Sequence, residues 1–63
     1  MPDKFTVAEK LASVEREIRM RRQVYGRQVT ANRMSQHRAD REVAIFEDIA
    51  DDYRRLKEGE RLL

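Results

Sequence analysis

The 63-residue chain contains no cysteine, which excludes disulfide bonds and metal sites built on thiolates. A chain of this size buries only about 60% of the surface that its unfolded form exposes, so its core is marginal. Without disulfides, such chains usually depend on a metal, on oligomerisation or on very good helix packing. We therefore expect one domain over residues 1–63, built as a long hairpin that a second copy supports.

Long apolar runs are absent as well. No run of about 7–15 apolar residues lies near the start, and none of about 18 occurs anywhere, so we expect neither a signal peptide nor a membrane span. The lack of cysteine also fits an intracellular protein.

Residues that carry chemistry are few. The only histidine, His37, lacks the partners that a catalytic triad or a metal site needs. Gly26 and Gly59 are isolated, so there is no glycine-rich phosphate loop. The sequence therefore predicts no enzyme, no cofactor and no metal. One acidic group could suggest a divalent ion, but helical spacing spreads its members around the side of a helix: Glu47, Asp48, Asp51 and Asp52.

Charge is abundant but nearly balanced. Charged residues make up 41% of the chain, and the net charge is +2. Between Arg16 and Arg41 there are eight arginines against two acids, which gives +6, while the remaining six bases and ten acids give −4. In a hairpin this distribution places positive charge toward the turn and negative charge toward the open end.

The first helix begins at a capping box, Thr6-Val7-Ala8-Glu9, and is predicted to run over about residues 7–31. Gly26 leaves two interpretations open: an unbroken helix with a weak point, or a kink or break after which a short further helix follows. We favour the unbroken helix because Val29 stays in phase with Tyr25. The apolar residues form one stripe roughly 60° wide, made of Val7, Leu11, Val14, Ile18, Tyr25 and Val29.

The predicted turn covers residues 32–35. Asn32 suits the left-handed position after a helix end, and Ser35 suits the cap of the next helix. The second helix is predicted over about residues 36–58, with Gly59 as its stop signal.

The second helix has a wider apolar face than the first, roughly 160° across. One narrow stripe cannot cover this face, which favours an antiparallel two-fold pair of hairpins forming a four-helix bundle. The alternative is a monomer in which Ile45 and Leu56 lie singly at the margin. The predicted core and self-association residues are Leu11, Val14, Ile18, Tyr25, Val43, Ile45, Phe46, Ile49, Tyr53 and Leu56; Ala39 and Ala50 lie on the same face.

The turn also sets a register in which residue i lies level with residue 67 − i. This register brings Glu15 near Arg54 and Arg22 near Glu47, two pairs of opposite sign. Such pairs fix register more than stability, because exposed ion pairs contribute at most about 1 kcal/mol. The register also places Leu11 level with Leu56, Val14 with Tyr53, Ile18 with Ile49, and Arg21 or Arg22 with Phe46.

Arginines concentrate on the outer face of the first helix and around the turn. Arginine forms charge-assisted forks with phosphate, so this face is a candidate for nucleic acid or for an acidic protein partner. The helix aromatics lie on the apolar stripes, which leaves none to stack on bases, and a solvated face is the simpler interpretation. The residues of this face are Arg16, Arg19, Arg27, Arg33, Arg38 and Arg41.

Three segments, residues 14–25 (VEREIRMRRQVY), 32–36 (NRMSQ) and 44–49 (AIFEDI), resemble a group of short uncharacterised phage and prophage proteins of proteobacteria. Members of this group carry an EIxMRRxVYP-like segment, a GRMTQ-like turn and a second helix. Gly26 stands where the group tends to have proline, which would imply a kink there, and Asn32 stands where it tends to have glycine. The resemblance implies a phage or prophage origin and a bacterial cytoplasm as the location, and it brings no established activity with it.

The sequence as a whole predicts an all-α, non-catalytic interaction or adaptor protein that self-associates through apolar helix faces. A nucleic-acid-binding accessory protein that uses the arginine face is the alternative.

Overall fold

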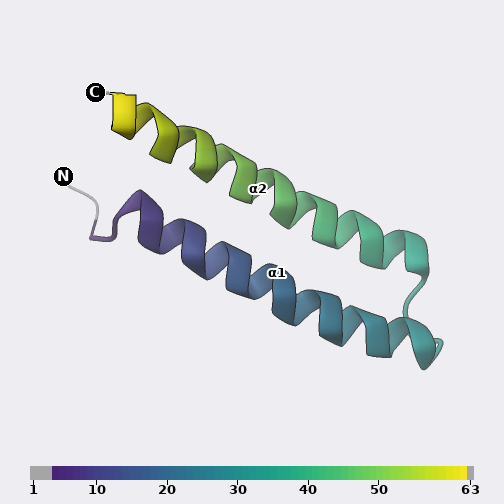
Figure 1. Ribbon diagram of the computed structural model, residues 1–63. Coiled ribbons are helices and arrows are strands. Elements are labelled where there is room, and N and C mark those ends of the chain that lie inside the picture. The colour runs from purple at the N-terminus through teal and green to yellow at the C-terminus, as the bar shows by residue number, and fades with distance from the viewer. Residues whose placement is uncertain (1–3, 63) are drawn as a thin grey trace.

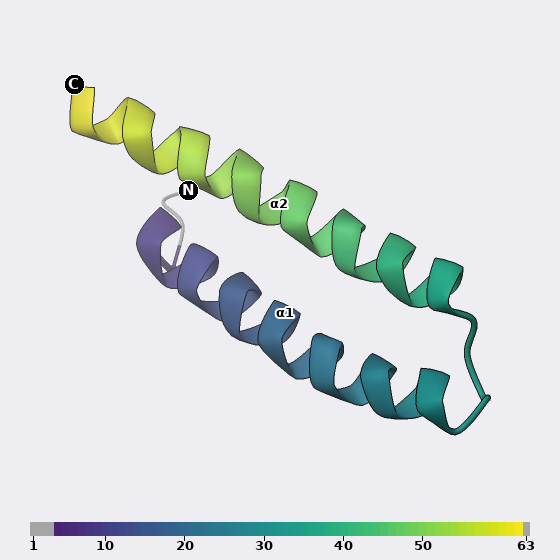
Figure 2. The same cartoon turned by 45° about the vertical axis from the view of Figure 1, so that its right-hand side comes forward.

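The computed structural model describes residues 4–62, with side chains through residue 60, and residues 1–3 and 63 of the predicted domain lie outside this range. The chain forms two helices, α1 (Val7–Thr30) and α2 (Gln36–Leu62). The helices lie side by side and antiparallel, with the turn at one end and both the start of α1 and the end of α2 at the other (Figures 1 and 2). The hairpin measures 48 × 18 × 18 Å. The predicted all-α antiparallel hairpin is confirmed.

α1 begins at the predicted capping box. The Glu9 amide donates to Thr6 Oγ1 at 3.0 Å, and the Thr6 amide donates to Glu9 Oε1 at 3.4 Å. These bonds satisfy two amides that have no partner inside the helix, and an N-cap of this kind stabilises a helix by about 1 kcal/mol.

α1 continues without a break through Gly26, so the unbroken helix is confirmed and a separate short helix is excluded. Gly26 does not adopt a positive φ, and a Cβ placed on it would meet no atom within 4 Å. The glycine is therefore required neither by the backbone nor by close packing, and it costs helix stability at this position.

A Schellman motif ends α1. Asn32 has φ 61°, as predicted for the residue after the helix, and its amide donates to the Val29 carbonyl at 3.0 Å. The Arg33 amide donates to the Gln28 carbonyl at 2.8 Å. Ser35 then caps α2, because its Oγ accepts from the Arg38 amide at 3.1 Å.

α2 is longer than the sequence suggested. It passes through Gly59 to Leu62, so the predicted stop at Gly59 is wrong. A glycine ends a helix when it adopts a left-handed φ, whereas Gly59 does not have a positive φ. Within a helix, glycine lowers stability by about 1 kcal/mol without ending it.

The core is a thin seam between the two helices. Its most buried side chains are Leu11 and Ile18 of α1 and Ala39 and Ala50 of α2. Val14, Val43, Phe46 and Tyr53 pack against this seam while remaining half-buried.

At the level of Ile18, the buried residue of α2 is Ala50 and not Ile49. Ala50 is 0% exposed and occupies the seam, while the adjacent Ile49 is 36% exposed. A small residue on the contact line lets two helix backbones approach closely, so α2 packs through one edge of its wide apolar face. The other edge, with Ile45 and Leu56, is left outside the seam. Leu56, predicted level with the buried Leu11, is therefore 56% exposed.

Candidate interaction surfaces

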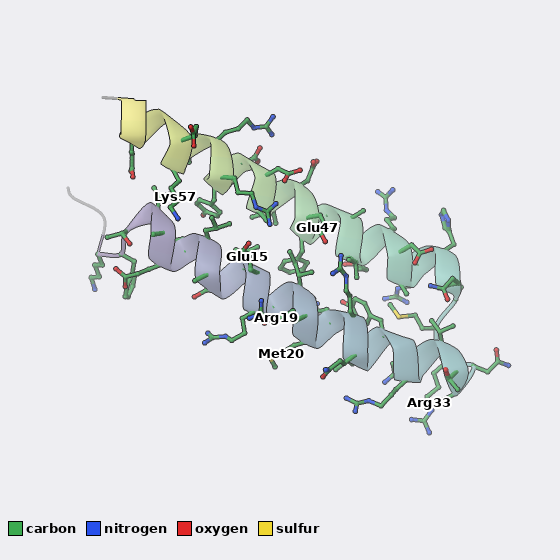
Figure 3. All side chains as sticks on the ribbon, viewed as in Figure 1. Glu15, Arg19, Met20, Arg33, Glu47 and Lys57 are labelled. Carbon is green, nitrogen blue, oxygen red and sulfur yellow. The ribbon has the colours of Figure 1, made fainter. Side chains whose placement is uncertain are left out.

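One side of the hairpin is closed by ion pairs between the helices, which we call the ion-paired side. Arg54 Nη2 lies 3.0 Å from Glu15 Oε2, and Arg22 Nη2 contacts Glu47 Oε1. Figure 3 shows Glu15 and Glu47 where α1 and α2 face each other. Both pairs were predicted from the register of the turn, and both are confirmed.

On this side, Arg54 bonds to two carboxylates. It donates to Glu15 of α1 and, at 2.7 Å, to Asp51 of its own helix. These two hydrogen bonds raise the pKa of the Arg54 guanidinium, with Glu15 as the larger cause. Because a raised pKa favours the charged form in the folded chain, this contribution is present below the ordinary titration range of arginine, while the two carboxylates are ionised, and it is lost as the pH rises into strong base.

Arg21 occupies the seam position between Ile18 and Tyr25. Its guanidinium lies 4.3 Å from the centre of the Phe46 ring and donates to the Tyr25 hydroxyl at 2.6 Å. The hydrogen bond to Tyr25 is the largest cause that raises the pKa of Arg21. The seam therefore accommodates a cation by placing it on an aromatic face, as a cation–π contact allows.

The opposite side of the hairpin carries uncovered apolar side chains, and we call it the apolar side. Ile45 is 44% exposed, Ile49 36% and Leu56 56%. Ile45 and Ile49 are each two residues from Glu47, and two residues correspond to about 200° of rotation, so they point roughly opposite the ion pairs. Val24 of α1, two residues after Arg22, is exposed on this side by the same geometry.

The sequence did not single out every exposed apolar residue. Val24, Met20 and Phe5 are all substantially exposed, at 42%, 54% and 59%. Val24 and Met20 are spaced i, i+4 and lie off the narrow stripe of α1, which is the signal that could have identified them. Met20 lies on the outer face of α1, away from α2 (Figure 3).

The arginines divide into two groups among the side chains of residues 4–60. Four are ion-paired: Arg21, Arg22, Arg54 and Arg55. The other six have no ion pair or side-chain hydrogen bond to another residue of this range, and all are exposed. We call them the unpaired arginines: Arg16, Arg19, Arg27, Arg33, Arg38 and Arg41. They are the six that the sequence assigned to the arginine face.

The unpaired arginines lie on two different surfaces. Arg16, Arg19 and Arg27 share the outer face of α1, while Arg38 and Arg41 lie in the first two turns of α2. Arg33 points away from α2 in Figure 3, whereas Arg19 borders the ion-paired side, where it lines a shallow hollow with Glu47 and Arg54. The three arginines of α1 therefore form one continuous face, which the turn extends through Arg33.

Carboxylates of the acidic group on α2 form ion pairs with different arginines. Glu47 pairs with Arg22, and Asp52 Oδ1 lies 3.0 Å from Arg55 Nη2. Within the described residues, no three histidine or carboxylate side chains converge as a metal site requires. His37 is exposed in the first turn of α2.

Neither helix, over its described residues, combines the length and apolar character needed to cross a membrane. Comparison of the chain with protein-family models, with curated proteins and with solved structures yields no match.

Proposed function

We propose that this protein is a non-catalytic accessory or adaptor protein of phage or prophage origin that works as a self-associated hairpin in the cytoplasm. The origin is supported by the resemblance of residues 14–25, 32–36 and 44–49 to short phage proteins. The most economical assembly is a homodimer in which two hairpins form a four-helix bundle.

The observation that supports self-association best is the size of the exposed surface. A compact monomer of 7.6 kDa exposes about 4,300 Å², whereas this chain exposes 5403 Å². No large side chain of the described residues is fully buried, and two of the four core residues are alanines. A hairpin with this core is marginal alone, because isolated helices gain most of their stability from packing an apolar face.

Sedimentation equilibrium of the purified chain at micromolar concentrations tests this proposal. We expect a mass of twice the 7.6 kDa of one chain, with dissociation on dilution. A 7.6 kDa monomer at every concentration would rule out self-association.

A second candidate function is nucleic-acid binding through the unpaired arginines. Arginines held in ion pairs must break those pairs before they contact phosphate, whereas these six are available without that cost. Binding of this kind weakens steeply with salt, because each phosphate contact releases counterions.

The test compares two triple variants in DNA binding across a salt series. Replacing Arg16, Arg19 and Arg27 by alanine should weaken binding and lower its salt dependence by about two to three charges. The matched control removes the same charge elsewhere, through alanine at Lys4, Arg55 and Lys57. Equal binding by the two variants would eliminate this candidate.

An acidic protein could use the same arginine face. A pull-down from the native host with the tagged chain, with and without nuclease, separates the two partners. Recovery that nuclease abolishes indicates nucleic acid, and recovery that survives nuclease indicates a protein.

A further inference from the structure

We infer that two copies pair through their apolar sides, with α2 antiparallel to the partner's α2 and Ile45 opposite the partner's Leu56. This inference rests on the proposed self-association and assigns to it a surface and an orientation. A two-fold axis would pass through the contact near Ile49 and Asp52.

The two long sides of the hairpin differ in whether contacts between the helices close them. The ion-paired side is occupied by the contacts of Glu15 with Arg54 and of Arg22 with Glu47. The apolar side has no such closure within the described residues, and its apolar side chains project from both helices. A partner that docks here covers apolar surface without breaking an ion pair between the helices.

The exposed surface of the chain is large enough to supply a dimer interface. Relative to a compact monomer, the chain exposes roughly 1,100 Å² too much. If each copy buries about that area on its partner, the total is about 2,200 Å², which lies in the range of stable homodimers. A second copy therefore accounts for the excess with a single interface.

Four residues on the apolar side of α2 have a regular spacing. Residues 45, 49, 52 and 56 are separated by four, three and four positions, which is the spacing of a helix–helix seam. This spacing reads the same in both directions, so an antiparallel two-fold places Ile45 against the partner's Leu56 at both ends. A closed two-fold contact of this kind uses the same patch on both copies.

Asp52 decides against the parallel arrangement. In a parallel pair it would face the same carboxylate of the partner at the centre of an apolar contact, which is unfavourable. In the antiparallel pair it lies level with the partner's Ile49, close to the two-fold axis, and does not face the same carboxylate directly. Its own Arg55 neutralises it there, since Asp52 Oδ1 lies 3.0 Å from Arg55 Nη2.

The absence of cysteine permits a direct test of this orientation. Full-length chains carrying Ile45→Cys or Leu56→Cys, distinguished by different tags, are mixed and oxidised mildly. A disulfide needs Cα atoms within about 7 Å, whereas equivalent positions on the antiparallel pair are offset by roughly 16 Å along the helix. We expect the mixed disulfide to form faster than either self-disulfide by on the order of tenfold.

Ala44→Cys is the matched control, because Ala44 is exposed on the same helix and points away from the apolar side. Circular dichroism of each variant establishes that the helices are retained. Sedimentation of the unmodified chain under the same conditions tests self-association separately from the orientation of the pair.

Each outcome bears on the inference. A dimer with the mixed disulfide favoured supports the inferred orientation. A dimer in which Ile45→Cys and Leu56→Cys each link to themselves is parallel, and it overturns the orientation while leaving self-association intact. A dimer whose linkage matches that of Ala44→Cys overturns the apolar side as the interface. A monomer at all concentrations overturns both proposals.

Discussion

The two long sides of this hairpin differ in what holds them. On one side, Arg22 and Arg54 reach across to carboxylates of the opposite helix. On the other, Ile45, Ile49 and Leu56 project from α2 without an apolar cover from α1. Exposed ion pairs specify register at little gain in stability, whereas exposed apolar surface is a source of binding energy. The ion-paired side is closed by contacts within the chain, and we propose that a second chain covers the apolar side.

The largest expected effect is a loss in the free energy of unfolding when a buried side chain of the seam between the helices is truncated. Ile18 is 4% exposed, and Ile18→Ala should lower the free energy of unfolding by about 2–4 kcal/mol through lost burial and a cavity. Urea unfolding followed by circular dichroism, at a fixed chain concentration, measures this loss. Ile49→Ala, on the apolar side, is the control and should cost less in the monomer. Equal losses at low concentration would show that the seam is misplaced.

The second-largest effect is expected on the dimer dissociation constant when charge is added to the apolar side. Ile45→Asp with Leu56→Asp removes apolar surface and places carboxylates in the inferred interface. The dimer dissociation constant should rise by on the order of a hundredfold or more, because a buried unpaired charge is costly. Ala12→Asp with Ala44→Asp adds the same charge at exposed positions away from the apolar side. If both double variants dimerise as the unmodified chain does, the apolar side is not the interface.

A smaller, stabilising effect is expected from Gly26→Ala. A Cβ at Gly26 meets no atom within 4 Å, so the substitution should raise the free energy of unfolding by about 1 kcal/mol through helix propensity. Gly59→Ala, near the end of α2, should give a smaller gain. Because Gly26 lies four residues from Arg22 on the ion-paired side, the dimer dissociation constant should not change. A loss of dimerisation would place the interface on that side instead.

The smallest effect is expected on the ion-paired side. Glu47→Gln removes the partner of Arg22 and should lower the free energy of unfolding by only about 0.2–1 kcal/mol. The difference from the unmodified chain should shrink in high salt, which screens exposed pairs. Asp48→Asn, on the same helix without an inter-helix pair, is the control. A loss larger than that of Ile18→Ala would reverse the assignment of the two sides.

The start of α1, the turn that follows it and the start of α2 could be predicted from the sequence because they depend on local chemistry. Thr6 and Glu9 satisfy each other's neighbouring amides, Asn32 tolerates a positive φ, and Ser35 caps the next helix. The two ion pairs between the helices followed from counting residues from the turn. Each of these features needs only a few adjacent residues or a fixed register.

The contact line on α2 could not be predicted in the same way. The wide apolar face of this helix allows several lines of contact, and closeness of backbone approach selects Ala50 over Ile49. Gly59 has the same sequence signal whether it ends a helix or continues one, since only its φ distinguishes the two. Which arginines remain unpaired depends likewise on which carboxylates the packing brings within reach.

The central claim is that a second copy covers the apolar side, and isotope-filtered nuclear Overhauser spectroscopy tests it most directly. A mixture of labelled and unlabelled chains reports only contacts between copies. We expect intermolecular contacts between the methyl groups of Ile45 and Leu56, with further contacts at Ile49. Intermolecular contacts confined to residues of the ion-paired side, or none at concentrations where the dimer sediments, would contradict the claim.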